Sequence, residues 1–174
     1  MVFDAGSDAV ADAVPCPNTA GETSAAVPEP IGHRGEVNWL DAMRPGPAFA
    51  PEPQRPEGPF MVINSVGRTF DERFGAAKAM DSVFGVERVR VSMDGVKGLR
   101  SHQSFSIQQS LGDAITITFW RDDAARRAYA YRPGEHKFQL DRYRELETAD
   151  RPSSTRLATP DRRGTWRGGN PFAR

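Results

Sequence analysis

The placement of proline sets the strongest limit on how this chain can fold, because ten of its 14 prolines precede Phe60. The residues between them are mostly Ala, Gly, Ser and Glu. Such a segment buries too little apolar surface to offset the conformational entropy of folding, roughly 1–2 kcal/mol per residue. We therefore predict that residues 1–59 form a mostly irregular N-terminal arm and that residues 60–174 hold the folded domain and a basic C-terminal tail.

The arm differs from the domain in charge and contains one segment with a different pattern. It carries nine acidic residues and three arginines, a net charge of −6, which leaves +6 for the rest of the neutral chain. In Glu36–Arg44 the apolar residues Trp39, Leu40 and Met43 share one face of a possible short helix. We interpret this helix as one that docks on the domain, with a lid or an arm exchanged between the subunits of a dimer as the alternative.

Composition excludes several classes of protein. A single cysteine, Cys16, cannot form an internal disulfide, and no stretch of 18 apolar residues is present, so we expect a cytoplasmic chain with no membrane span. Six arginines lie within residues 151–174, but the chain as a whole is neutral, so its net charge does not indicate nucleic-acid binding. We expect small-molecule partners and no nucleic acid.

Apolar periodicity and turn residues predict the order of elements in the domain. Thr69 and Glu72 fit a capping box, Gly85 suits a left-handed helix end, and Asp122 fits a helix N-cap. Pro133 should interrupt the helix that Asp122 begins. The expected elements are a strand over Phe60–Gly67, a helix from Thr69 to Gly85, a strand or helix extension over Glu87–Met93, a hairpin of Ser104–Ser110 and Ala114–Trp120, two helices before Asp150, and a strand over Ser154–Thr159.

This order predicts an α+β, ferredoxin-like βαββαβ fold. Helices in such a fold cover one face of the sheet and leave the other open. Two sheets packed face to face would cover both open faces, so we expect a homodimer in the form of a dimeric α+β barrel.

Three histidines are the main candidates for chemistry, because no phosphate-binding loop, nucleophile elbow or Cys-x-x-Cys motif is present. We expect His33 to be solvated. His102 precedes the predicted hairpin. His136 shares a helix face with Leu140 and Tyr143, so its ring could face an apolar cavity and bind a metal, although a purely structural histidine remains the alternative.

The aromatic and basic residues before His136 also have two interpretations. Tyr129, Tyr131 and Arg132 could line a pocket, where the guanidinium would pair with a haem propionate or a substrate carboxylate. Alternatively, they belong to an amphipathic helix with packed rings and solvated arginines. We expect Trp120 and Trp166 to be core or interface residues.

Three segments resemble a known family. "TFWRDDAARRAYAYRPGEHKFQLDRYRE", "GVKGLRSHQSF" and the C-terminal "RRGTWRGGNPF" are similar to segments of the spheroidene monooxygenase-like proteins, over roughly residues 60–172. The resemblance implies a dimeric α+β barrel that inserts oxygen into an apolar substrate, with haem as the cofactor.

We therefore expect a haem-dependent monooxygenase that acts on a small or apolar metabolite. The alternatives are a cofactor-free barrel monooxygenase and a ligand-binding barrel without catalysis. The expected roles are His136 as the metal and cofactor ligand, Arg132, Tyr129 and Tyr143 as further cofactor-binding residues, and His102 and Gln108 as catalytic donors to oxygen or substrate.

Overall fold

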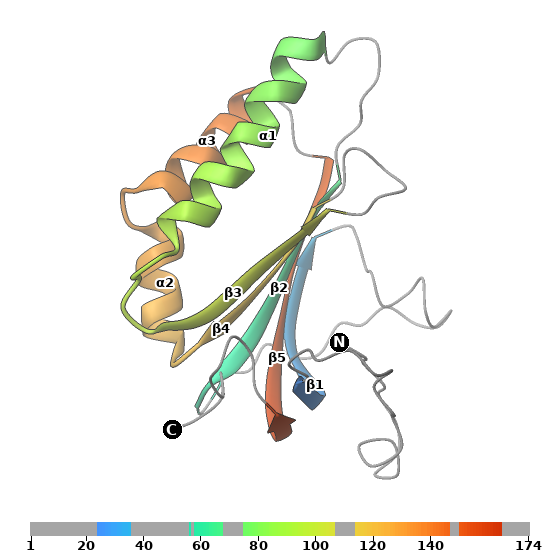
Figure 1. Ribbon diagram of the computed structural model, residues 1–174, viewed down its shortest axis with the longest axis vertical. Helices are drawn as coiled ribbons and strands as arrows, with labels where there is room; N and C mark the ends of the chain where they lie inside the picture. The colour runs from blue at the N-terminus through green and yellow to red at the C-terminus, as the bar shows by residue number, and fades with distance from the viewer. Residues whose placement is uncertain are drawn as a thin grey trace, which may run out of the picture.

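The computed structural model describes residues 24–35, 56, 58–67, 75–106, 114–146 and 150–164. These residues form one antiparallel sheet, with the helices on one of its faces (Figure 1). Within them, no helix is long and apolar enough to cross a bilayer. The elements in chain order are β1 (Ser24–Gly35), β2 (Phe60–Gly67), α1 (Gly75–Ser92), β3 (Leu99–Ser106), β4 (Ala114–Trp120), α2 (Asp123–Tyr131), α3 (Glu135–Leu146) and β5 (Asp150–Gly164).

The order of strands across the sheet confirms the expected fold class. It runs β1-β5-β2-β4-β3, and every neighbouring pair is antiparallel. The four strands from β2 to β5, with α1 after the first and the α2–α3 pair before the last, follow the ferredoxin-like βαββαβ pattern. The single chain is thus an α+β, ferredoxin-like domain. Its closure into a dimeric barrel stays a prediction.

Strand β1 lies within the segment that we expected to be irregular. It pairs along its length with β5, from Ser24 opposite Gly164 to Gly35 opposite Ser153. An edge strand has a neighbour on one side only, so it tolerates prolines that a central strand would exclude. The register shifts beside Pro28 and Pro30 mark where the ladder adapts to them. The remainder of the arm, including Glu36–Arg44, lies outside the described residues.

His33 differs from its expected solvated state. It lies on β1, and its Nδ1 is 2.8 Å from the Thr155 hydroxyl on β5. The pairing of these two strands brings the imidazole and the hydroxyl together across 122 positions of sequence, a contact that no local pattern indicates.

Helix α1 continues past the point where we expected it to end. Gly85 is buried in the middle of the helix, and a Cβ there would overlap the Gln139 side chain of α3. The glycine therefore allows α1 and α3 to pack closely, and it does not form the left-handed turn that we expected. Of the two interpretations of Glu87–Met93, the helix extension is confirmed, since α1 runs to Ser92, and the strand is wrong.

The break between α2 and α3 agrees with its sequence signals. Asp122 caps α2, with its Oδ1 accepting a hydrogen bond of 2.7 Å from the Ala125 N–H. The helix ends before Pro133, and α3 begins at Glu135. This short break places His136 in the first turn of α3, directly after the aromatic end of α2.

The two faces of the sheet carry separate apolar clusters, because neighbouring residues of a strand point to opposite sides. Phe60, Val62 and Trp120 pack on the side of the helices, with Ala125 and Tyr129 of α2 against them. The side chains of the second cluster are each no more than 5 % exposed; they are Met61, Ile63, Ile117, Phe119 and Leu157. The first cluster forms one boundary of the cavity described next.

Candidate functional site

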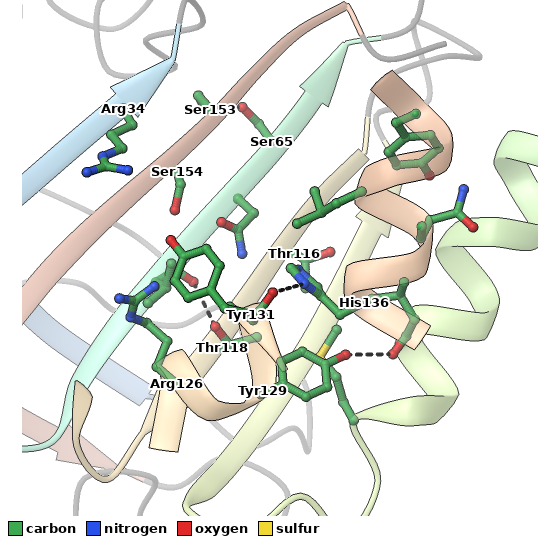
Figure 2. A pocket seen from close by; sticks show the side chains of 18 of the residues that line it. Arg34, Ser65, Thr116, Thr118, Arg126, Tyr129, Tyr131, His136, Ser153 and Ser154 are labelled. Carbon is green, nitrogen blue, oxygen red and sulfur yellow. Dashed lines mark hydrogen bonds between the residues drawn. The ribbon is translucent and has the colours of Figure 1, made fainter. Parts of the chain in front are cut away.

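A cavity of about 720 Å³ lies between the sheet and the helices that cover it (Figure 2). Its helical side includes the apolar residues Val89 of α1, Met93 directly after α1, and Leu140 of α3. Its sheet wall is more polar, with Thr116 and Thr118 of β4 and side chains of β2 and β5. A volume of this size with a few polar groups is typical of a small-molecule site.

His136 contributes a basic nitrogen to this cavity. Its Nδ1 lies 3.3 Å from the carbonyl oxygen of Ala130. Because a carbonyl can only accept, Nδ1 carries the proton, and in the neutral ring Nε2 holds the free lone pair. Burial lowers the pKa of His136, although the hydrogen bond to Ala130 acts in the opposite direction. The imidazole is therefore neutral at physiological pH and able to accept a proton or bind a metal.

The rings of Trp120, Tyr129 and His136 form a continuous aromatic wall of the cavity. The ring centroids of Trp120 and Tyr129 are 5.7 Å apart, and those of Tyr129 and His136 are 5.1 Å apart. The Tyr129 hydroxyl lies 2.9 Å from the Ser92 hydroxyl and donates to the Val89 carbonyl. Burial raises the pKa of Tyr129, so this phenol stays protonated. These contacts hold the rings in fixed positions beside the cavity.

The cavity brings together three of the expected site residues. His136, Tyr129 and Tyr143 all line it, and the predicted face of His136, Leu140 and Tyr143 is confirmed. Arg132 does not line it: this exposed residue ends α2, where its N–H donates to the Ala128 carbonyl.

Of the two residues expected to act as donors, the structure describes only His102. His102 lies on β3 with its side chain 7 % exposed, and its Nε2 is 3.0 Å from Oδ1 of Asp94. It is not part of the lining. Gln108 lies outside the described residues. Their catalytic roles stay predictions.

Gln139 is a candidate that sequence reasoning missed. It lines the cavity, is 1 % exposed, and its Oε1 accepts a hydrogen bond of 3.1 Å from Arg88. This bond fixes the orientation of the amide, so Nε2 is the remaining donor, and among the described residues it has no partner. A buried donor without a partner costs about 1–3 kcal/mol. A Cβ at Gly85 would overlap this nitrogen, so the amide lies against α1. Its only signal in the sequence is its spacing of three residues from His136.

The described part of the chain contains no group of three or more His, Cys, Asp or Glu side chains able to hold a metal ion. A haem iron is a different case because the protein needs to supply only one axial ligand. His136, with its second nitrogen donating to a carbonyl, has the arrangement typical of metal-binding histidines.

Comparison with known proteins gives structural neighbours but no relatives by sequence. No protein-family model and no curated protein match the chain. Similar solved structures include an antibiotic biosynthesis monooxygenase, with a TM-score of 0.48 and 11 % identity over 59 % of this chain and 98 % of that chain. Rv0793 from Mycobacterium tuberculosis has a TM-score of 0.48 and 17 % identity, over 59 % and 96 %.

A third neighbour is SnoaB, a cofactor-independent oxygenase from Streptomyces nogalater. It has a TM-score of 0.44 and 16 % identity, over 60 % of this chain and 94 % of that chain. The likeness of these structures lies in their general architecture. The resemblance to spheroidene monooxygenase-like proteins stays a prediction.

Proposed function

We propose that this chain is an enzyme that oxidises a small, flat aromatic molecule with oxygen, and that His136 is its general base. The observation that carries the proposal is the state of the imidazole: it is neutral, its Nδ1–H is held by Ala130, and it lies on the wall of a cavity of about 720 Å³. A fixed, neutral base beside apolar and aromatic walls suits proton removal from a phenol-like substrate.

The surrounding groups support this chemistry. The wall of Trp120 and Tyr129 offers ring faces and edges against which an aromatic substrate can pack. Gln139 also lines the cavity, and its Nε2, which lies against Gly85 of α1, has no partner among the described residues. Thr116 adds a hydroxyl on the sheet side of the cavity. Together these groups bind, orient and deprotonate one substrate.

The proposed reaction balances without an external reductant because the substrate supplies the electrons. His136 takes the phenol O–H proton, and the electron-rich phenolate reduces oxygen and bonds to it at a ring carbon. Protonation gives a ring hydroperoxide. Loss of the proton at that carbon then breaks the O–O bond, releases water and leaves a second C=O. The net change is phenol plus oxygen to quinone plus water.

An oxygen electrode tests this proposal directly. Purified protein, prepared without added cofactor, should consume oxygen with members of a panel of two-ring and three-ring phenols and form the corresponding quinones. Failure to oxidise any member while the protein remains folded would contradict the proposal.

Haem in this cavity is the second candidate. His136 Nε2 would bind the iron, and Arg34 and Arg126, both on the lining, would pair with the propionates. The observation that favours haem is the hydrogen bond between Nδ1 of His136 and Ala130. Bound haem would supply oxygen activation.

Haemin titration separates the two candidates. If the second one holds, wild-type protein should develop a Soret band at a stoichiometry of one, and His136→Ala should lose or shift it. Lys137→Gln, a change at the adjacent position of α3, serves as the control and should retain the band. A featureless titration, or a spectrum unchanged in His136→Ala, would contradict haem binding by His136.

The lowered pKa of His136 predicts how activity and stability depend on pH. The neutral base remains present below pH 6.5, the ordinary value for histidine, so kcat/KM should begin to fall only at a more acidic pH. In the window between the two pKa values, the unfolded chain binds a proton that the folded chain does not. Stability should therefore decrease as the pH falls, by at most about 1.4 kcal/mol per pH unit.

Urea unfolding of the wild type and of His136→Gln across this window measures the effect. The difference between the two proteins should change with pH, since the variant lacks the titrating group. Parallel curves for the two proteins, or an acid limb of kcat/KM centred above pH 6.5, would contradict the buried, neutral state of His136.

A further inference from the structure

We propose that the cavity carries a site for an anionic group, formed by Arg34, Arg126 and Arg156, and that its substrate is an aromatic acid with a carboxylate. This inference rests on the proposed function and names the class of substrate. The three arginines come from β1, α2 and β5, which are far apart in sequence. Arg34 and Arg126 line the cavity, and Arg156, which is not part of the lining, lies on the same face of the sheet.

Two of these arginines belong to the cavity lining. Arg34 and Arg126 both line it. In Figure 2 they lie on the same side of the view, with Ser154 between them and His136 on the other side. A ligand could therefore reach from the guanidinium groups to the base. This arrangement suits a molecule that is charged at one end and aromatic at the other.

The third arginine is held on the face of the sheet that bears the cavity. Arg156 pairs with Gly32 of β1 and with Val62 of β2, and Val62 is part of the lining. A Cβ at Gly32 would overlap the Arg156 guanidinium, so the glycine leaves room for that group to lie across β1. The neighbouring residue on the same face, Ser154, also lines the cavity.

Around Arg156, the arginines outnumber the carboxylates that could neutralise them. Asp123 forms ion pairs of 2.7 Å with Arg126 and 2.6 Å with Arg127. Arg34 and Arg156 make no ion pair with any described residue. Four guanidinium groups thus share one carboxylate.

The electrostatics of Arg156 agree with this imbalance. Burial, and then the charges of Arg126, Arg34 and Arg127, lower the pKa of Arg156, while Asp123 acts in the opposite sense. Bringing like charges together around a half-buried guanidinium is unfavourable unless an anion binds among them. A carboxylate matches the planar fork of arginine and can accept two hydrogen bonds from one group.

A pair of fluorescent probes with related ring systems tests the proposal without turnover. Anilinonaphthalene sulfonate is anionic, and phenylnaphthylamine is its neutral counterpart. Wild-type protein should bind the anionic probe more tightly, and added salt should weaken that preference. Arg34→Gln should reduce the preference about fivefold to tenfold, while Arg34→Lys should reduce it less. Leu140→Trp narrows the cavity and should weaken the binding of both probes.

Lys97→Gln is the matched control, since it removes one exposed positive charge outside the cavity lining and should leave the preference unchanged. An equal preference in wild type and Arg34→Gln, or no preference in the wild type, would overturn the anionic site. The experiment distinguishes this site from the proposed reaction. If the protein oxidises no phenol but still prefers the anionic probe in a way that depends on Arg34, the anionic site is supported and the reaction is rejected.

Discussion

Replacing His136 with Gln should lower kcat for phenol oxidation by about 10²–10⁴-fold while changing KM little. Glutamine retains a polar side chain of similar size but has no nitrogen that can accept a proton near neutral pH. The loss therefore reports the base and not the volume of the cavity. Steady-state oxygen consumption, with quinone formation followed by absorbance, measures both constants.

Two further variants make this experiment specific. His136→Gly should be partly rescued by added imidazole, because a free base can occupy the space that the side chain leaves. Lys137→Gln changes the next residue of α3, whose ammonium pairs with Asp141 at the surface, and should retain activity within about twofold. Full activity in His136→Gln would remove His136 from the reaction.

Replacing Gly98 with Ala should destabilise the fold by about 2–4 kcal/mol. This glycine precedes β3 with a φ of 86°, in the left-handed region that disfavours a side chain. A Cβ there would also overlap the Cβ of Ala125 on α2. Its carbonyl accepts a hydrogen bond of 2.8 Å from the N–H of Arg121. The substitution would therefore move the start of α2 away from the sheet.

Gly95→Ala is a control for the backbone contribution alone. Gly95 has a φ of 76°, but a Cβ there would have no heavy atom of another residue within 4 Å. We expect this variant to lose about 1–2 kcal/mol. Urea unfolding gives both values, and Gly98→Ala should also lower Tm by about 5–15 °C. Equal losses in the two variants would show that the contact with Ala125 contributes nothing.

Local signals in the sequence predicted much of the ferredoxin-like order of elements. The Asp122 cap, the break at Pro133 and the alternation in β4 depend on neighbouring residues, so they can be read directly from the chain. The helix face of His136, Leu140 and Tyr143 could be predicted for the same reason, because positions four and seven residues apart stack on one side of a helix.

Tertiary contacts decided the features that local patterns described wrongly. Gly85 resembles a helix end, but in the fold it provides room for Gln139 of α3, and the helix continues. The prolines of β1 suggest irregular structure, yet an edge position beside β5 tolerates them. In each case a partner from a distant part of the chain supplied the stabilising contact.

The sequence by itself determined the α+β order of the elements from Phe60 onward and that His136 would lie on an apolar helix face. Only the tertiary structure decided which groups share a cavity with that histidine. It placed Arg34 of β1 and Gln139 of α3 on the lining and left Arg132 and His102 outside it. The physical reason is that periodicity fixes the side of an element on which a residue lies, whereas strand pairing and helix packing fix what lies opposite.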